Sequence, residues 1–320
     1  MRTIALIMIM AANIIALMPG RAMAAGEITI PPDSFEVLLS TGLALFSRGD
    51  YPGAISNYEK AIKIKPANFD ALYNLGLSCQ FSKDNARALE VYRKAMEINP
   101  RDYALNLNYG IAMEDSGDLS KAVEYLEKAA ALDPRRFEAY YNLSNIYLLQ
   151  KKYADAIRVC KLGLAANINH DRLHNNLGYA YFNTGKASDA IGCARTAIMI
   201  NPANEVAHFN LGTYYEAGNN AAGAVECYKK ALEIKPDYYD ALLNSGTLDA
   251  QSNGMKTAEA KLLKAKTIKP SDGRAYYNLG ILYQMSGENK KAIAEYKQAM
   301  SLDPSYSSEL TPYIKQLEGK

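Results

Sequence analysis

The sequence predicts an all-α fold: a right-handed superhelical solenoid of eight 34-residue helix-turn-helix repeats with a C-terminal cap helix. Three observations lead to this prediction. Strings similar to "YNLG" recur every 34 residues, small residues stand at fixed places in each period, and a proline closes all periods but one. A length of 320 residues alone suggests two domains, but a regular internal period outranks that expectation.

The repeat frame fills residues 35–306 without an insertion, and positions are counted from the first residue of each repeat. The eighth position is Gly except for Ser144, the twentieth is always Ala, the twenty-seventh is Ala except for Gly163, and the thirty-second is Pro except for Ile168. The predicted repeats are 35–68, 69–102, 103–136, 137–170, 171–204, 205–238, 239–272 and 273–306.

Each repeat reads as an antiparallel pair of helices. Two segments of about 13 residues carry apolar residues at intervals of three and four, and a Gly, Asn or Lys separates them at position fifteen. The small residues mark where the two helices approach most closely. The closing proline stops the second helix, because its ring cannot continue the hydrogen-bond ladder. Such pairs cannot bury their apolar faces alone and therefore stack on their neighbours.

The two ends of the array need caps. At the front, residues 25–34 are expected to form an extended lead and an N-cap, with "DSFE" as a capping box in which Asp33 takes the place of Ser or Thr. At the back, residues 307–320 are expected to form the cap helix. Leu310, Tyr313 and Leu317 repeat the apolar phase of a first helix, and Ile314 stands where a partner helix would require a small residue.

The pattern of small residues and prolines resembles the tetratricopeptide repeat, and the resemblance covers residues 35–306. The family's usual Trp at position four is absent throughout. The resemblance implies a superhelix whose concave groove binds other proteins. It does not imply capture of chaperone tails by a carboxylate clamp, because that clamp needs Lys or Arg at positions five and nine, and no repeat has one there.

Residues 1–24 have the layout of a cleaved secretory signal peptide. Arg2 precedes an apolar run from Ile4 to Met18, a Pro-Gly pair interrupts the run, and "AMA" precedes the expected cleavage after Ala24. The protein is therefore expected to be exported, either periplasmic or secreted. Retention of the segment as an anchor is the alternative, although its run of about 15 residues is shorter than the roughly 20 needed to span a bilayer.

Cleavage would leave 34 basic and 34 acidic residues, so the mature chain is formally neutral. Neither its net charge nor a run of Lys and Arg supplies the positive footprint that nucleic acid or an anionic membrane requires. The expected partner is another protein.

An asparagine recurs at position six of every repeat but the first, opposite the apolar stripe of the first helix. A carboxamide offers both donors and an acceptor to a peptide backbone. Helices about 8 to 10 Å apart would let each Asn meet about every third residue of an extended ligand, so the row would follow roughly 20 residues. The row comprises Asn74, Asn108, Asn142, Asn176, Asn210, Asn244 and Asn278.

This row is similar to the asparagine ladder in the tetratricopeptide domain of O-linked N-acetylglucosamine transferases, which implies a grip on the backbone of an extended protein. The chain has no glycosyltransferase domain beside its repeats. Aromatic residues at positions five and nine are expected to contact ligand side chains. These are Tyr73, Tyr141, Tyr179, Phe209 and Tyr277. The alternatives are that the Asn residues bond locally to helices and that the aromatic residues only pack between them.

The sequence shows no sign of an enzyme, a cofactor or a metal site. It has no phosphate-binding Gly loop, no nucleophile elbow and no base held beside a nucleophile. His174 and His208 occupy position four, where packing is expected, and His170 adds no metal-binding cluster. Cys79 and Cys160 fall at core positions and are expected to be buried free thiols.

These features predict a non-enzymatic protein-interaction module, an adaptor or assembly factor of a bacterial envelope that holds an extended polypeptide in its groove. The alternative is a structural scaffold, or a self-associating subunit, that uses its convex faces or ends.

Overall fold

The computed structural model describes residues 31, 33–252 and 254–319. The predicted signal peptide and most of the extended lead lie outside these residues. The described residues form seventeen α-helices and one short 3₁₀ helix, with no strand. None of these helices is long and apolar enough to cross a membrane.

The described residues divide into two compact units, one up to residue 150 with residues 165–167 and the other of residues 151–164 with those from 168 onward. The helices of the first unit are α1 (Phe35–Ser47), α2 (Tyr51–Ile64), α3 (Phe69–Phe81), α4 (Asn85–Ile98), α5 (Tyr103–Asp115), α6 (Leu119–Leu132) and α7 (Glu138–Leu149). Helix α8 (Tyr153–Ala166) belongs to the second unit except for its C-terminal end.

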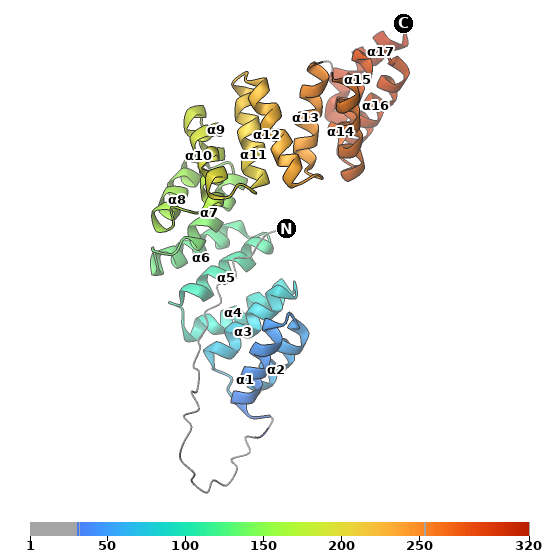
Figure 1. The fold of residues 1–320 in the computed structure, drawn as a ribbon. Coiled ribbons are helices and arrows are strands. Elements are labelled where there is room, and N and C mark those ends of the chain that lie inside the picture. Colours follow the sequence, from blue (N-terminus) through green and yellow to red (C-terminus); the bar gives the residue numbers. More distant parts are fainter. Residues whose placement is uncertain (1–30, 32, 253, 320) are drawn as a thin grey trace, which may run out of the picture. The chain divides into compact units, whose positions relative to one another are not determined.

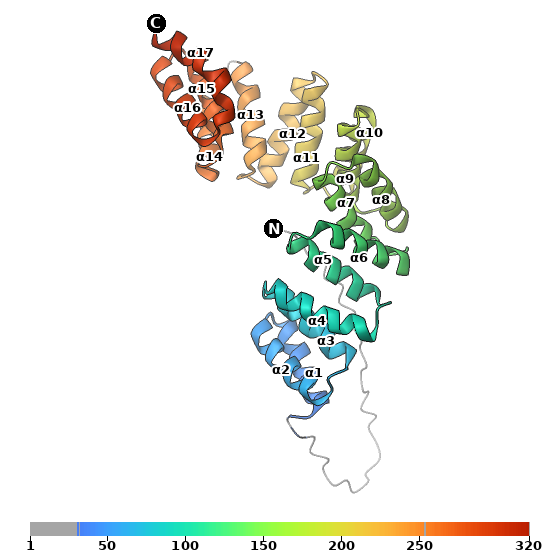
Figure 2. The same cartoon turned by 180° about the vertical axis from the view of Figure 1, so that it is seen from behind.

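The second unit continues with further helix pairs of the same period and ends with the cap helix. Its remaining helices are α9 (Asp171–Asn183), α10 (Ala187–Ile200), α11 (Glu205–Ala217), α12 (Ala221–Ile234), α13 (Tyr239–Gln251), α14 (Met255–Ile268), α15 (Gly273–Met285), α16 (Asn289–Leu302) and α17 (Ser307–Glu318), with the 3₁₀ helix Pro304–Tyr306 before α17. Figures 1 and 2 show from opposite sides that α15 and α16 lie next to each other, with α17 beside α16.

The predicted helix-pair repeat fold is confirmed. First helices begin at the first residue of the predicted repeats, except that α7 begins one residue late, after an N-cap (Phe137) whose side chain makes no capping bond. Second helices end at position thirty in every repeat. Helix α8 ends there too, although Ile168 replaces the usual proline, so the stop does not depend on the proline alone.

The turn inside each repeat is set at position fifteen, where the backbone takes a positive φ in all seven repeats whose turn the structure describes. Gly residues supply it in four of them, and Lys83 (φ 66°), Lys151 (φ 56°) and Asn219 (φ 59°) supply it in the others. A left-handed conformation is unstrained for Gly and costs energy for Lys. The separator predicted from the sequence is therefore the residue that reverses the chain.

In four repeats the glycine at position eight makes room for a tyrosine at position twenty-four of the partner helix. A Cβ atom added to Gly76 would lie 2.4 Å from Cε1 of Tyr92, and one added to Gly280 would lie 2.4 Å from the ring of Tyr296. Both tyrosines are buried, with 0% and 1% of their surface exposed. In these four repeats the close approach predicted from small residues is a glycine backbone packed on a tyrosine ring.

Both predicted caps need a one-residue correction. The N-cap of α1 is Ser34, whose Oγ accepts a hydrogen bond from the backbone N–H of Val37 at 3.4 Å, and not Asp33. The cap helix α17 buries Leu310, Ile314 and Leu317, whereas Tyr313 remains 43% exposed. Ile314 lies on the buried face because no partner helix follows to exclude its bulk.

Candidate peptide-binding site

The position-six asparagines lie on the first helices of successive repeats, and each unit carries its own row. Asn74, Asn108 and Asn142 lie on α3, α5 and α7 of the first unit. Asn176, Asn210, Asn244 and Asn278 lie on α9, α11, α13 and α15 of the second. These side chains are less exposed than a position opposite the apolar stripe suggests, since six are half-buried and Asn210 is only 8% exposed.

Four of the amides donate a hydrogen bond to the preceding repeat. Asn108 donates through Nδ2 to the Tyr73 hydroxyl at 2.8 Å, and Asn210 donates to Oδ1 of Asn175 at 2.8 Å. In the later repeats, Asn244 donates to the hydroxyl of Tyr228 and Asn278 to the hydroxyl of Thr247, at 3.1 and 3.2 Å. These bonds join helices of neighbouring repeats.

The two other first-unit asparagines behave differently. Asn142 donates to the carbonyl oxygen of Glu138, one turn earlier in its own helix, at 2.8 Å. The Asn74 side chain makes no hydrogen bond within the described part of the chain. Neither of these two side chains therefore links neighbouring repeats, whereas that of Asn108 does.

The donors of most amides are thus occupied, while their carbonyl oxygens keep their acceptor capacity. Among the described residues, Oδ1 of Asn108, Asn244 and Asn278 accepts no hydrogen bond, and none of the three atoms is fully buried. An amide oxygen has two lone pairs and accepts readily from a backbone N–H. The row therefore offers a ligand mainly hydrogen-bond acceptors. The expected contact with a peptide unit is thus to its N–H and not to its carbonyl oxygen.

Three of the four aromatic residues at position five pack against other aromatic rings. The ring of Tyr73 stacks on Phe69 with a centroid distance of 5.9 Å, and its burial raises the pKa of the Tyr73 hydroxyl to about 12. Phe209 lies 5.7 Å from the Tyr228 ring, and Tyr277 lies 5.0 Å from the Tyr306 ring. Of the five aromatic residues predicted to bind, Tyr179 at position nine is the most exposed, at 40%.

Three of the position-twenty-four tyrosines are fixed by the residue at position twelve. The hydroxyl of Tyr92 donates to Oε1 of Gln80 at 3.0 Å, and that of Tyr228 donates to Oε2 of Glu216 at 2.6 Å. Tyr296 donates to Gln284 at 2.7 Å. In the first repeat Phe46 occupies position twelve, and the buried hydroxyl of Tyr58 has no partner among the described residues. The sequence analysis missed this pairing, although a Gln or Glu at position twelve accompanies each of these three bonded tyrosines.

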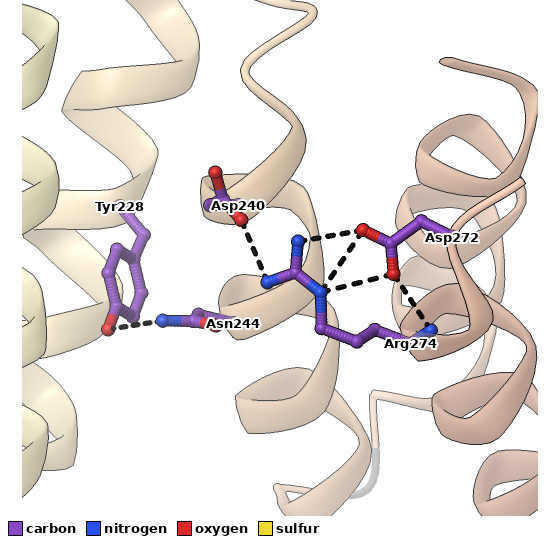
Figure 3. A network of polar contacts seen from close by, with 5 residues as sticks. All are labelled: Tyr228, Asp240, Asn244, Asp272 and Arg274. Atoms are coloured by element: carbon purple, nitrogen blue, oxygen red, sulfur yellow. Dashed lines mark hydrogen bonds and ion pairs between the residues drawn. The ribbon is translucent and has the colours of Figure 1, made fainter. Parts of the chain in front are cut away.

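A charged bridge fixes the seventh repeat to the eighth. Figure 3 shows the Arg274 guanidinium at the start of α15 between Asp240 of α13 and Asp272 of the preceding loop. The shortest contacts are 3.0 Å to Asp240 and 2.8 Å to Asp272. The hydrogen bonds from Arg274 lower the pKa of Asp272 to about 2. In the same view, Asn244 donates to the hydroxyl of Tyr228.

In the fifth, sixth and eighth repeats the polar side chain at position four bonds to the carbonyl oxygen at position thirty-two of the preceding repeat. His208 meets the carbonyl of Pro202 at 3.1 Å, and Nε2 of His174 meets that of Ile168 at 2.9 Å. Tyr276 donates to the carbonyl of Pro270 in the same way, at 3.0 Å. The packing role predicted for these two histidines therefore includes a hydrogen bond that sequence reasoning did not anticipate.

The other candidates for chemistry have structural roles. His170 caps α9 by accepting from the backbone N–H of Leu173 at 3.1 Å. The described residues contain no group of three or more His, Cys, Asp or Glu placed to hold a metal ion. Cys79, Cys160 and Cys227 are buried free thiols, and Cys193 is a half-buried one. Burial raises the pKa of Cys79 to about 12.

Comparison with solved structures shows the same fold in several proteins. The APC/C hetero-tetramer of Cut9 and Hcn1 superposes with a TM-score of 0.65 at 16% identity, covering 91% of this chain and 57% of that one. PilF of Pseudomonas aeruginosa superposes with a TM-score of 0.56 at 21% identity, and the match covers 63% of this chain and 92% of that one. The human IFIT1 dimer with m7Gppp-AAAA superposes with a TM-score of 0.52 at 20% identity, and the match covers 84% of this chain and 72% of that one. At these identities the likeness extends to the fold alone.

No curated protein matches the sequence. Two family models do. One, described as the tetratricopeptide repeat, matches residues 273–306, which is the predicted eighth repeat. The other, described as the C-terminal domain of cilia and flagella-associated protein 70, matches residues 8–241, more than half of the chain. The chain therefore belongs to the family of that C-terminal domain, a family of tetratricopeptide repeats.

Proposed function

We propose that the protein is a non-enzymatic interaction module, exported to a bacterial envelope, that binds a partner polypeptide in extended form along its asparagine rows. Its fold is one whose members serve as protein-binding scaffolds. The observation that carries the proposal is the repetition of one amide at the same helical position in successive repeats, with its donor engaged and its oxygen left as an acceptor.

The proposed contact is a hydrogen bond from a ligand backbone N–H to an asparagine Oδ1. Helices about 8 to 10 Å apart and an extended chain that advances about 3.3 Å per residue bring every third ligand residue to one Asn. The four asparagines of the second unit would then follow about ten ligand residues. Backbone contacts give affinity without demanding a fixed sequence, as in other modes of extended-peptide recognition.

A second candidate function is supported by the same bonds. Because Asn108, Asn210, Asn244 and Asn278 donate to the preceding repeat, the row also serves to hold repeats together. If this were its whole purpose, the protein would act as a scaffold or self-associating subunit through its convex faces or ends, and the row would need no ligand.

The first unit offers a clean test, because two of its asparagines can be changed without breaking a bond between repeats. The double variant Asn74→Ala/Asn142→Ala is expected to keep its thermal melt and weaken partner binding about 5- to 30-fold, from two lost bonds of about 1 kcal/mol each. Asn57→Ala is the matched control, since Asn57 on the second helix α2 also donates one turn back, to Gly53 at 2.9 Å.

Binding can be read by photo-crosslinking in a cell-envelope extract. A benzoylphenylalanine placed at Leu43, a position-nine residue that is 55% exposed, should capture the partner, whereas one at Ile64 of α2, 50% exposed, should not. The double variant should lose the Leu43 crosslink and the Asn57 variant should keep it. Equal crosslinking in all three proteins would reject the ligand function and favour the scaffold.

A further inference from the structure

A cavity of about 370 Å³ lies near the C-terminal end of the second unit, between the first helix of the eighth repeat and the cap helix. Its walls include Tyr277, Ile281 and Met285 of α15, Tyr296 of α16, and Glu309 and Tyr313 of α17. Figures 1 and 2 show these three helices together at this end of the chain. A volume of this size accommodates one or two side chains rather than a folded domain.

The rim of the cavity is apolar and exposed to solvent. Ile281, Met285 and Tyr313 have 36%, 51% and 43% of their surface exposed. Ile281 stands at position nine of α15, on the same helix as Asn278, so a chain that follows the asparagine row of this unit reaches the cavity. Apolar side chains that remain exposed around a concavity are typical of a surface that another molecule covers.

One acidic group stands at this rim without a cationic partner. Oε1 of Glu309 accepts a hydrogen bond from the Tyr277 hydroxyl at 2.6 Å, and this bond raises the pKa of Tyr277, so the hydroxyl remains a donor. In the described part of the chain Glu309 forms no ion pair, whereas Glu318 on the same helix pairs with Lys297 at 2.9 Å. The second carboxylate oxygen of Glu309 can therefore meet a cation brought by a ligand.

We propose that this cavity binds a segment of the partner polypeptide in which a large apolar residue stands next to a Lys or Arg. The apolar side chain enters between Ile281, Met285 and Tyr313, and the cation pairs with Glu309. That the ligand is a polypeptide rests on the proposed function. The cavity adds selection of particular ligand side chains, which the asparagine rows do not provide because they contact the backbone.

The direct test is a charge reversal read by peptide selection. A phage-displayed library of random peptides, each about 12 residues long to span one unit's row, is selected against the mature chain, against Glu309→Lys, and against Glu226→Lys, which changes an exposed Glu on α12. The mature chain and the Glu226 variant should both enrich an apolar residue beside Lys or Arg. The Glu309 variant should instead enrich an apolar residue beside Asp or Glu. A common motif in all three selections, or no enrichment, would overturn the proposal.

The apolar contact is tested with one selected peptide, labelled with fluorescein and titrated by anisotropy. Ile281→Ser/Met285→Ser should weaken its binding roughly tenfold or more, because apolar burial is lost. Glu309→Gln should weaken it about two- to fivefold, the strength of an exposed ion pair. Met199→Ser, which changes a 75% exposed methionine on α10, is the control and should have no effect. Equal affinities throughout would contradict the assignment.

The two proposals fail in distinguishable ways. If the charge reversal changes the selected motif while Asn74→Ala/Asn142→Ala leaves crosslinking intact, the cavity binds peptide and the asparagine row does not. If the asparagine variant loses the crosslink while the selections are insensitive to Glu309, the row binds polypeptide and the cavity assignment is wrong. Far-UV circular dichroism of every variant separates these outcomes from unfolding.

Discussion

The packing of glycine against tyrosine at positions eight and twenty-four predicts that Gly76→Ala destabilises the protein. The added Cβ would lie 2.4 Å from Cε1 and 2.5 Å from Cδ1 of Tyr92, where ordinary contact begins near 3.4 Å. Tyr92 is 0% exposed and its hydroxyl is bonded to Gln80, so the ring cannot move aside freely. Overpacking of this kind costs about 1–3 kcal/mol.

The helical preference of Ala over Gly offsets part of that cost, by about 1 kcal/mol. With a strained or broken Tyr92 bond adding about 1 kcal/mol, the net loss in the free energy of unfolding is expected to be about 1–3 kcal/mol. Gly192→Ala on α10 is the matched control. Nothing lies within 4 Å of its added Cβ, so it should stabilise by about 0.5–1 kcal/mol.

The assay is urea denaturation followed by far-UV circular dichroism, because the chain has no tryptophan. A Tyr92→Ala background gives a further check, since the methyl group that Gly76→Ala adds would then occupy vacated space and cease to destabilise. The reasoning is refuted if Gly76→Ala is as stable as the parent, or if its effect is the same with and without the Tyr92 ring.

Three further predictions concern single bonds and pH. Asn108→Ala should lower the free energy of unfolding by about 0.5–1.5 kcal/mol, because it removes a bond between repeats, whereas Asn74→Ala should be neutral or slightly stabilising; paired urea titrations decide. Tyr92→Phe should lower the free energy of unfolding by about 1 kcal/mol, because it removes the bond to Gln80. Tyr58→Phe should leave that free energy unchanged or raise it, because the Tyr58 hydroxyl is buried without a partner among the described residues. Equal losses in urea titrations of the two variants would contradict this. Burial raises the pKa of Cys79 from 9.0 to about 12, so its stabilising contribution is complete below about pH 9 and is lost as the pH rises toward 12. Urea midpoints should therefore fall between about pH 8.5 and about pH 11, and less steeply in Cys79→Ala than in the parent.

Much of the fold could be predicted from the sequence, because a tandem repeat reports the same constraint eight times. The frame predicted the start of nearly every first helix, the separators at position fifteen marked the positive φ, and small residues marked the close helix contacts. The two cap errors arose where the repeat has no further copy, at Asp33 and Ser34 and at Tyr313 and Ile314. A shift of one residue decides which side chain caps the helix at the front and which is buried at the back.

The candidate site was harder to predict, because it depends on side-chain partners that differ between repeats. The asparagine is constant, but its acceptor is Tyr73 in one repeat, Asn175 in another and Thr247 in a third. A helical wheel places position six opposite the buried stripe and cannot show that the preceding repeat reaches it. The cavity beside Glu309 was not predicted for a related reason, since it forms where the cap helix departs from the repeat. The signal peptide, export and peptide binding remain predictions.

The central claim is that asparagine oxygens accept hydrogen bonds from the backbone of an extended partner. The most direct measurement is an N-methyl scan of the captured partner's binding segment, in which each backbone N–H is replaced in turn and the affinity for the mature chain is measured. The proposal predicts losses of about fivefold or more that recur about every third residue. Where the peptide lies on the first unit, the losses opposite residues 74 and 142 should disappear in the Asn74→Ala/Asn142→Ala variant, and the loss opposite Asn108 should remain. Uniform tolerance of N-methylation, with affinity set by side chains alone, would contradict it.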